Sequence, residues 1–325
     1  MKKIFITGGA GYVGTVLSNY LLEKGYEVTI YDLMIYGVHF KRNKNLQIIK
    51  GDIRDKKKIK DFIKNHDVVI HLACISNDPS FELNPNLGKE INYDSFEPLV
   101  EISKDEGIKR FIYASSSSVY GVKKELNVTE EMKLEPLTDY SKYKALCEEI
   151  LIKYSTEDFV TLIVRPATVC GYSPRQRLDL VVNILTNLAY HKREITIFGG
   201  DQLRPNIHIQ DMARAYELFI NEDNEKINGK IFNIGFENQS VNQLAYQVQK
   251  VIGADVKIKK LPTNDNRSYH ISSKKIQDEL GFIANFSILN AIEDLKYVFE
   301  KKLLSDCLTN ENYFNIKKMQ SIDLK

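Results

Sequence analysis

Short apolar runs alternate with longer amphipathic runs through the first half of the chain. Six apolar runs rich in Val, Ile, Phe and Tyr predict strands at 2–7, 27–31, 46–50, 67–72, 110–114 and 159–165. Stretches of helical periodicity lie between most of them, at 11–24, 56–65, 90–104 and 139–154. Strands that are apolar on both faces and alternate with helices are typical of a parallel sheet covered on both sides. We therefore expect a doubly wound α/β domain of the Rossmann type at 1–165, with ligands at the carboxyl ends of its strands.

The pattern changes after residue 165. A turn-rich segment at 166–177 precedes predicted helices at 179–191, 211–221, 240–252 and 287–302, and predicted strands at 195–198, 207–209 and 230–234. We interpret 166–205 and 237–303 as a smaller α/β substrate-binding domain, and we expect 206–236 to return to the large sheet. The polar segment 304–325 is expected to be either a frayed tail or a strap on a partner subunit.

Composition excludes several classes of function. The 325 residues carry 45 Lys and Arg against 43 Asp and Glu, a net charge of +2, which gives no support to a nucleic-acid partner. No apolar run approaches the roughly 18–20 residues of a membrane span, and the N-terminus leads straight into the first strand, so we expect neither a membrane protein nor a signal peptide. The four cysteines are far apart and form no C-x-x-C, which argues against a disulfide frame or metal site and favours the cytoplasm.

A glycine-rich segment connects the first strand to the first helix. Residues 7–14 are Thr-Gly-Gly-Ala-Gly-Tyr-Val-Gly, with glycines at 8, 11 and 14. Glycines so placed allow a tight turn, let backbone N–H groups approach a pyrophosphate and let helix and strand pack closely. The N-terminus of the helix adds its partial positive charge to those donors. Because glycines gather in many kinds of turn, this segment alone is a weak signal for a dinucleotide.

Two carboxylates at the ends of the next strands agree with such a site. Asp32 ends the second strand, where it can accept hydrogen bonds from both hydroxyls of an adenosine ribose. Asp52 and the apolar Ile53 end the third strand, where they can hold adenine. The alternative for Asp32 is a turn residue or a helix cap, but the glycine segment before it favours the cofactor role. Because a carboxylate would repel a 2′-phosphate, we expect NAD rather than NADP.

A Tyr and a Lys four residues apart share one helix face and form a candidate proton-transfer group. Tyr, with a pKa of about 10, is a poor base at neutral pH, but a nearby ammonium favours the phenolate and lowers that pKa. The spacing occurs six times, starting at Tyr20, Tyr120, Tyr140, Tyr246, Tyr297 and Tyr313. Position favours Tyr140 and Lys144, because they open the helix after the fifth strand, whose end faces the ligand edge of the sheet.

Four serines, at 115–118, follow the fifth strand. A polar turn is the common role of such a run. Beside a Tyr base, however, one of these hydroxyls can bind the same substrate oxygen as the Tyr and polarise the reacting hydroxyl or carbonyl.

Together these segments resemble the extended short-chain dehydrogenase/reductase family, in particular its NAD-dependent nucleotide-sugar epimerase and dehydratase branch. The resemblance spans roughly residues 2–300 and rests on the motifs at 7–14, 51–55, 71–73, 114–121, 140–144, 165–169 and 207–211. It implies NAD as cofactor, a nucleotide-sugar substrate and a setting in polysaccharide biosynthesis. It also implies that Tyr140 is the base, that Lys144 lowers the pKa of Tyr140 and binds the nicotinamide ribose, and that Ser116 is the hydroxyl partner.

The same resemblance assigns binding residues. The implied cofactor residues, in addition to Tyr140 and Lys144, are Gly8, Gly11, Tyr12, Val13, Gly14, Asp32, Asp52, Ile53, Leu72, Ala73, Asn92, Ser115, Pro166 and Val169. The implied substrate residues are Ser76, Ser118, Thr168, Asn183, Arg204 and Arg267. The two arginines stand where family members grip the substrate diphosphate, a role that suits a guanidinium fork. A surface charge is the alternative for each of them.

Departures from the family pattern narrow the reaction. Dehydratases and decarboxylases of the family carry an acidic residue one or two positions after the catalytic Ser or Thr, where this chain has Ser117 and Ser118. The family's reductases prefer NADPH, which Asp32 disfavours. We therefore expect an NAD-dependent nucleotide-sugar epimerase that oxidises a ring hydroxyl transiently. The alternatives are a dehydrogenase or dehydratase that releases a keto sugar, and a redox sensor or RNA-binding protein on the same fold. Such non-catalytic relatives commonly lose the Tyr–Lys pair, which this chain keeps.

The resemblance also implies a homodimer. The predicted helices at 90–104 and 139–154 each carry an apolar stripe, and family members pair these helices with their copies in a four-helix interface. The alternative is that both stripes only cover the sheet of their own chain.

Overall fold

The apolar runs form a seven-stranded parallel sheet in the computed structural model, which describes residues 1–325 except 124, 126, 264–267, 269, 323 and 325. Neighbouring strands follow the order β10-β6-β5-β4-β1-β2-β3, and each pair is parallel. The strands are β1 (Lys3–Thr7), β2 (Glu27–Asp32), β3 (Leu46–Lys50), β4 (Val68–His71), β5 (Arg110–Ala114), β6 (Val160–Pro166) and β10 (Lys230–Ile234). The expected doubly wound α/β class is confirmed.

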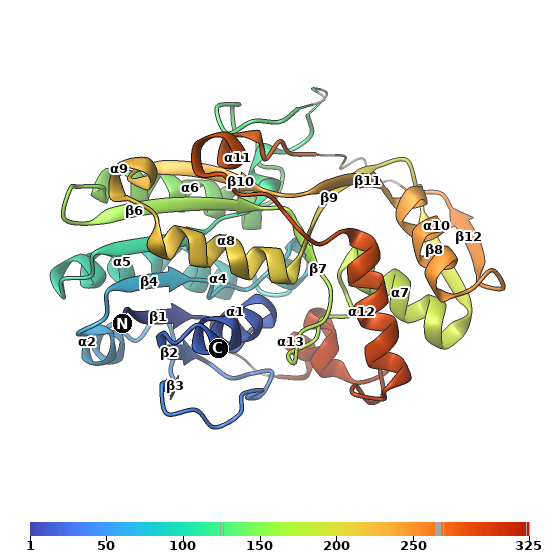
Figure 1. The fold of residues 1–325 in the computed structure, drawn as a ribbon, viewed down its shortest axis with the longest axis horizontal. Helices are drawn as coiled ribbons and strands as arrows, with labels where there is room; N and C mark the ends of the chain where they lie inside the picture. The colour runs from blue at the N-terminus through green and yellow to red at the C-terminus, as the bar shows by residue number, and fades with distance from the viewer. Residues whose placement is uncertain (124, 126, 264–267, 269, 323, 325) are drawn as a thin grey trace.

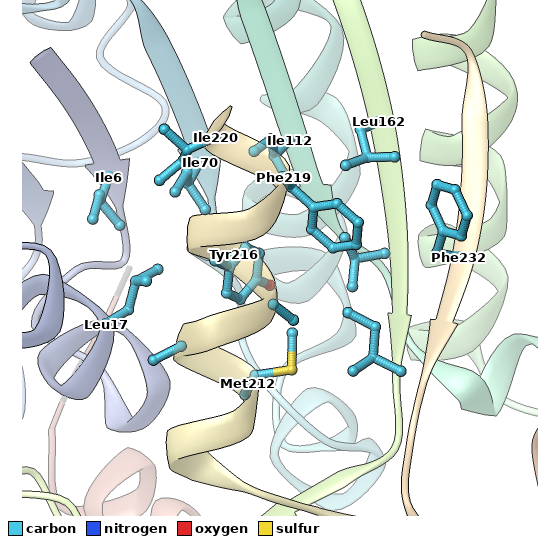
Figure 2. Close-up of a cluster of buried hydrophobic side chains, with 14 of the residues drawn as sticks. Ile6, Leu17, Ile70, Ile112, Leu162, Met212, Tyr216, Phe219, Ile220 and Phe232 are labelled. Carbon is cyan, nitrogen blue, oxygen red and sulfur yellow. The ribbon is translucent and has the colours of Figure 1, made fainter. Parts of the chain in front are cut away.

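Helices cover both faces of this sheet. One face carries α1 (Tyr12–Glu23) and α8 (Ile209–Asn221), and the other carries α2 (Lys56–Ile63), α5 (Phe96–Asp105) and α6 (Asp139–Tyr154). Figure 1 shows α8 in front of the strands and α5 and α6 behind them. Figure 2 shows side chains of α1 and α8 packed against side chains of β1, β4, β5, β6 and β10. The labelled residues are Ile6, Leu17, Ile70, Ile112, Leu162, Met212, Tyr216, Phe219, Ile220 and Phe232.

The strand order creates the edge at which a ligand can bind. β1 pairs with β2 on one side and with β4 on the other. The strands that follow β1 are therefore added first on one side of it, as β2 and β3, and then on the other, from β4 onward. Thr7 is in register with both Tyr31 and His71, which aligns the carboxyl ends of the three strands. In open parallel sheets this reversal of strand order is where ligands bind.

The remaining elements form a smaller α/β part at one end of the sheet (Figure 1). It contains a three-stranded sheet, β7 (Thr168–Cys170), β9 (Leu203–His208) and β11 (Glu237–Ser240), and a two-stranded one, β8 (Glu194–Phe198) and β12 (Lys257–Leu261). Its main helices are α7 (Val181–Lys192), α10 (Val241–Ile252) and α12 (Ile288–Glu300), which share a separate apolar core. The segments α8 and β10 return to the large sheet from within this part of the sequence.

Short helices complete the fold. They are α3 (Asp78–Glu82), α4 (Pro85–Lys89), the π-helix η1 (Glu90–Asp94), η2 (Ser117–Tyr120), α9 (Asn224–Ile227), α11 (Lys274–Leu280), η3 (Glu311–Tyr313) and α13 (Asn315–Ser321). The helix expected at 90–104 therefore begins as a π-helix and continues as α5, and the strand expected at 207–209 is the end of β9. The C-terminal segment contains η3 and α13, and α13 packs beside α3 of its own chain, while its expected role as a strap on a partner subunit stays a prediction.

The described residues include neither a membrane-crossing helix nor a metal-binding cluster. No described helix combines the length and apolarity that a membrane crossing requires. No group of three or more His, Cys, Asp or Glu among these residues is arranged to hold a metal ion.

Candidate active site

A cleft runs along the carboxyl edge of the large sheet and gathers most of the sequence-predicted cofactor residues. Its walls come from the glycine segment, the ends of β2, β4, β5 and β6, helix α6 and the C-terminal segment. The predicted residues that line it are Gly8, Gly11, Tyr12, Val13, Gly14, Asp32, Ile53, Leu72, Ala73, Ser76, Ser115, Tyr140, Lys144, Pro166 and Val169. These residues span 162 positions of the chain, from 8 to 169, so the fold and not the local sequence brings them together.

The glycine segment is packed too tightly for side chains. Gly8 has φ +73°, and a Cβ there would lie 2.5 Å from the backbone N of Ala73. A Cβ on Gly14 would lie 2.5 Å from the carbonyl oxygen of Gly8. Gly11 caps the N-terminus of α1, so the first N–H groups of that helix face the cleft wall. This cradle of backbone donors at a helix N-terminus fits the diphosphate of a dinucleotide.

Asp32 lies at the end of β2 with its carboxylate held by the backbone. Oδ2 accepts from the N–H of Ala10 at 3.0 Å, and Oδ1 accepts from the N–H of Met34 at 2.8 Å. Burial raises the pKa of Asp32, while the two backbone donors act in the opposite direction. Each oxygen keeps a lone pair for a ribose hydroxyl. The preference for NAD over NADP that follows from this carboxylate stays a prediction.

Asp52 pairs with a neighbouring arginine, and its role at adenine stays a prediction. Its carboxylate accepts from Nε and Nη2 of Arg54, and it is not among the residues that line the cleft. Burial acts to raise the pKa of Asp52, but the hydrogen bonds and the charge of Arg54 lower it overall. The backbone around Asp52 still shapes the cleft, because Gly51 and Ile53 line it.

Tyr140 and Lys144 both face the cleft from the first turns of α6. Thr138 caps this helix with a capping box, which fixes where the helix begins. Nζ of Lys144 donates to the carbonyl oxygen of Ala114, at the end of β5, over 2.7 Å. It lies 6.0 Å from the ring centre of Tyr140 and 4.9 Å from that of Tyr113. Lys144 as a whole residue is 3% exposed, so its charge acts on the phenol with little screening by water.

A buried polar network supports α6 from below. Glu148, one turn after Lys144, accepts from the Ser115 hydroxyl and forms a 2.6 Å ion pair with Arg165 of β6. Nη1 of Arg165 also donates to the Tyr120 hydroxyl at 2.7 Å. Tyr120, which starts another of the six Tyr-x-x-x-Lys pairs, is therefore a structural member of this network, and Lys124 lies outside the described residues. The network clamps α6 to the ends of β5 and β6, where the candidate base must stay.

The serines divide between two roles. Ser115 lines the cleft, with its hydroxyl turned to Glu148. Ser116 caps η2, its Oγ accepts from the N–H of Ser118, and the two hydroxyls are 2.8 Å apart. Both are half-buried and neither lines the cleft. Binding of substrate by Ser116 or Ser118 therefore stays a prediction.

Asn92 lies behind the cleft wall. Its amide donates to the carbonyl oxygen of Ile75 at 2.9 Å and accepts from the N–H of Ile75 at 2.8 Å. Asn92 is 3% exposed within the π-helix, an element that is rare and often found at functional sites. Its side chain thus fixes the loop after β4, whose residues line the cleft, while Asn92 itself does not.

Fewer of the predicted substrate residues than of the predicted cofactor residues line the cleft. Ser76 lines the cleft, but Thr168, Asn183 and Arg204 do not, and Arg267 lies outside the described residues. Asn183 is fully buried, where its amide donates to the carbonyl oxygen of Arg177 and accepts from the N–H of Gly171. It braces the segment after β7. All six substrate roles stay predictions, and among the described residues in that set only Ser76 lines the cleft.

The family is decided by a comparison over most of the chain. The model of the NAD dependent epimerase/dehydratase family matches residues 4–235. The chain belongs to this family. Its cofactor is NAD, and the glycine cradle, Asp32 and Lys144 are the residues of this chain that fit it.

Named relatives of the family agree on nucleotide-sugar chemistry but not on one reaction. The chain is 29% identical over 279 residues to a UDP-N-acetyl-alpha-D-glucosaminuronate decarboxylase of Bacillus cytotoxicus, covering 80% of this chain and 84% of that protein. It is 26% identical over 320 residues to a UDP-glucose 4-epimerase of Corynebacterium glutamicum, covering 93% and 96%. The crystal structure of a Thermotoga maritima UDP-glucose 4-epimerase superposes with a TM-score of 0.83 at 25% identity, covering 93% of this chain and 100% of that one.

Sequence reasoning missed several residues that line the cleft, and four of them are polar or charged residues that contact one another or their neighbours. Tyr36, Arg175 and Arg177 line the cleft, and so does Asn315 from the C-terminal segment. The arginines stand in a turn-rich segment with no recognisable motif, and Asn315 lies 140 positions beyond Arg175.

Proposed function

We propose that the protein is an NAD-dependent nucleotide-sugar epimerase that oxidises a ring hydroxyl to a keto intermediate and then reduces it from the opposite face. The observation that carries this proposal is the charge of the cleft. Asp32, at the ribose end, is the one acidic residue among the described residues that line it. Elimination of water requires an acid or base beside the sugar, and no carboxylate lines that region of the described cleft.

The residues divide the chemistry between them. Tyr140 takes the proton of the ring hydroxyl as the carbonyl forms and returns it when the carbonyl is reduced. Lys144 stabilises the phenolate by its nearby ammonium. When bound, NAD takes up the hydride from the ring carbon and gives it back. Glu148 and Arg165 keep α6 in place during both steps.

The proposal is tested by a screen of UDP-, GDP-, CDP- and dTDP-sugars with the purified enzyme and NAD. Proton NMR follows new sugar isomers, and absorbance at the NADH band follows net oxidation. An epimerase gives a second isomer at equilibrium with no rise of NADH. A keto sugar formed with stoichiometric NADH would identify a dehydrogenase, and a keto deoxy sugar formed without NADH would identify a dehydratase.

A homodimer is part of this proposal. The apolar cluster behind the sheet includes buried residues of α5 and α6, and Ile152 of α6 remains 43% exposed. Pairing of these two helices with their copies would bury that surface. Light scattering of the full chain at micromolar concentration should give twice the 37.4 kDa mass of one chain. A monomer would contradict the dimer and leave the proposed reaction untouched.

A further inference from the structure

Arg175 is a buried cation that has no carboxylate partner among the described residues. It is 3% exposed, and its Nε has no hydrogen-bond partner there. Nη2 donates to Oδ1 of Asn315 at 2.7 Å, and the guanidinium lies 3.6 Å from the ring centre of Tyr36. These are neutral contacts. Burial of a charge without an opposite charge is costly, so such a residue is retained where something else supplies that charge.

Arg177, two residues later, is a buried arginine that does have a carboxylate partner. Its Nε donates to Oδ1 of Asp179 at 2.9 Å, and Nη2 donates to Oδ2 of the same carboxylate. Burial and the charge of Arg177 together lower the pKa of Arg175 to about 10. The pKa of Arg177, by contrast, is raised, because the charge and hydrogen bonds of Asp179 outweigh the effect of burial. The charges of Asp179 and Asp32 also act on Arg175, but from a distance. Among the described residues, only Arg177 of the two has a carboxylate at ion-pair distance.

The unneutralised guanidinium lies on the glycine-segment side of the cleft. Arg175 and Tyr36 line the cleft together with Tyr12 and Asp32. Ser173 ties the segment of Arg175 to the glycine segment, because its hydroxyl donates to the carbonyl oxygen of Tyr12 at 2.8 Å. The dinucleotide diphosphate is the anion expected at a glycine cradle of this type. A planar guanidinium suits phosphate oxygens because its donors form a rigid fork.

We propose that Arg175 is the counter-ion of the NAD diphosphate, and that Asn315 and Tyr36 position it for that role. The glycine cradle supplies neutral backbone donors, and Arg175 supplies the positive charge. The inference holds whichever sugar reaction the enzyme catalyses.

Asn315 makes the C-terminal segment part of the cofactor site. Its Oδ1 accepts from Arg175, its Nδ2 donates to Oγ of Ser76 at 2.9 Å, and its backbone N–H donates to Asp179 at 2.9 Å. With 3% of its surface exposed, Asn315 is locked into these contacts. It thus joins both arginine environments to the loop after β4.

The test compares ligands that share one part of NAD. The full-length chain, freed of bound nucleotide with charcoal, is titrated with NAD and ADP-ribose by calorimetry and with adenosine by NMR. Arg175→Gln should bind NAD and ADP-ribose about 10- to 100-fold more weakly, the loss expected for a charge-assisted contact. Adenosine, which lacks the diphosphate, should bind within about twofold of the parent. The control is Arg110→Gln, which removes another buried guanidinium at the far end of β5 and should leave all three affinities unchanged.

Further variants separate binding from folding and positioning. Arg175→Met should have a melting temperature in the absence of ligand no lower than that of the parent, because an apolar chain replaces an uncompensated charge. Asn315→Ala should weaken ADP-ribose binding less than Arg175→Gln does, and should add little to it in the double variant. UDP should bind the parent and Arg175→Gln equally.

Three outcomes would overturn the inference. The first is unchanged affinity of Arg175→Gln for ADP-ribose. The second is an equal loss of affinity for adenosine, which would indicate a general collapse of the cleft. The third is loss of UDP binding with NAD binding intact, which would assign Arg175 to the substrate.

Discussion

Two helices of this protein carry the same Tyr-x-x-x-Lys pair in opposite settings. On α6, Nζ of Lys144 lies 6.0 Å from the ring centre of Tyr140, and on α12, Nζ of Lys301 lies 5.7 Å from that of Tyr297. By spacing and cation–ring distance the two pairs are nearly identical. The two pairs differ in exposure. Tyr297 is 56% exposed and Lys301 is also exposed. Tyr140 is half-buried, Lys144 is 3% exposed, and both line the cleft.

The difference lies in what holds each helix. The ammonium of Lys144 is anchored to the carbonyl oxygen of Ala114 at the end of a central strand, above the Glu148–Arg165 pair. Helix α12 packs its apolar face on the small core, and its Tyr points to solvent. In water the charge of Lys301 is screened, so it has little effect on the neighbouring phenol. The Tyr-x-x-x-Lys spacing can therefore support proton transfer only where the pair is buried and where a hydrogen-bond network holds its helix at the carboxyl edge of the sheet.

The largest expected difference between the two pairs appears when the hydroxyl of each tyrosine is removed. Tyr140→Phe keeps the ring and its packing, so NAD binding and stability should survive while turnover falls about 10²–10⁴-fold, the usual effect of a lost acid–base group. Tyr297→Phe, the matched control, should leave turnover unchanged. Steady-state rates on a sugar found by the screen decide between them. A Tyr140→Phe rate within about twofold of the parent, roughly 0.4 kcal/mol in barrier, would show that Tyr140 is not the base.

The second effect concerns the support under α6. Glu148→Ala leaves Arg165 buried without its carboxylate, so the free energy of unfolding should drop by about 3–5 kcal/mol. Glu300→Ala, on the exposed side of α12, should change it by less than about 0.5 kcal/mol. Urea denaturation of both variants measures the difference. Equal stabilities would mean that the network does not hold α6.

The third effect concerns the ammonium. Lys144→Met should impair turnover and also weaken NAD binding, by about 10-fold or more, because a charged donor to the ribose is lost. Lys301→Met should change neither quantity. Calorimetric titration with NAD is the measurement. Normal NAD affinity in Lys144→Met would restrict Lys144 to an effect on Tyr140.

The last effect is a pH dependence of stability from His71, on which the charge of Lys144 acts. Burial, and then the charge of Lys144, lower the pKa of His71 to about 3. The unfolded chain takes up a proton at about pH 6.5 while the folded one does not, so stability is lost as pH falls below about 6.5, by up to about 1.4 kcal/mol per unit. His71 also shares a 2.7 Å hydrogen bond with Thr7. Urea denaturation at pH 7 and pH 5 should show a flatter pH dependence in His71→Gln than in the parent, and equal slopes would contradict this origin.

The sequence was sufficient to predict cleft residues where one short segment determines their geometry by itself. The glycine segment, Asp32 and the Tyr140–Lys144 pair each stand at a predicted strand end or helix start, so their place in the order of strands and helices predicts that they line the cleft. It was insufficient where contacts join distant segments. Asn315 and Ser76 are 239 positions apart, and no periodicity connects them. Asn92 lies in a π-helix and its side chain bonds to the backbone of Ile75, and apolar spacing does not reveal such a local change of helix type.

The central claim is that the hydride leaves and returns within one active site, and an isotope measurement tests it most directly. A nucleotide sugar deuterated at the reacting carbon is incubated with the enzyme and an excess of unlabelled NADH. The account predicts that the epimer keeps its deuterium at that carbon, and that NADH neither accumulates nor acquires label. Loss of the deuterium to the NADH pool, or a keto sugar formed with an equal amount of NADH, would contradict it.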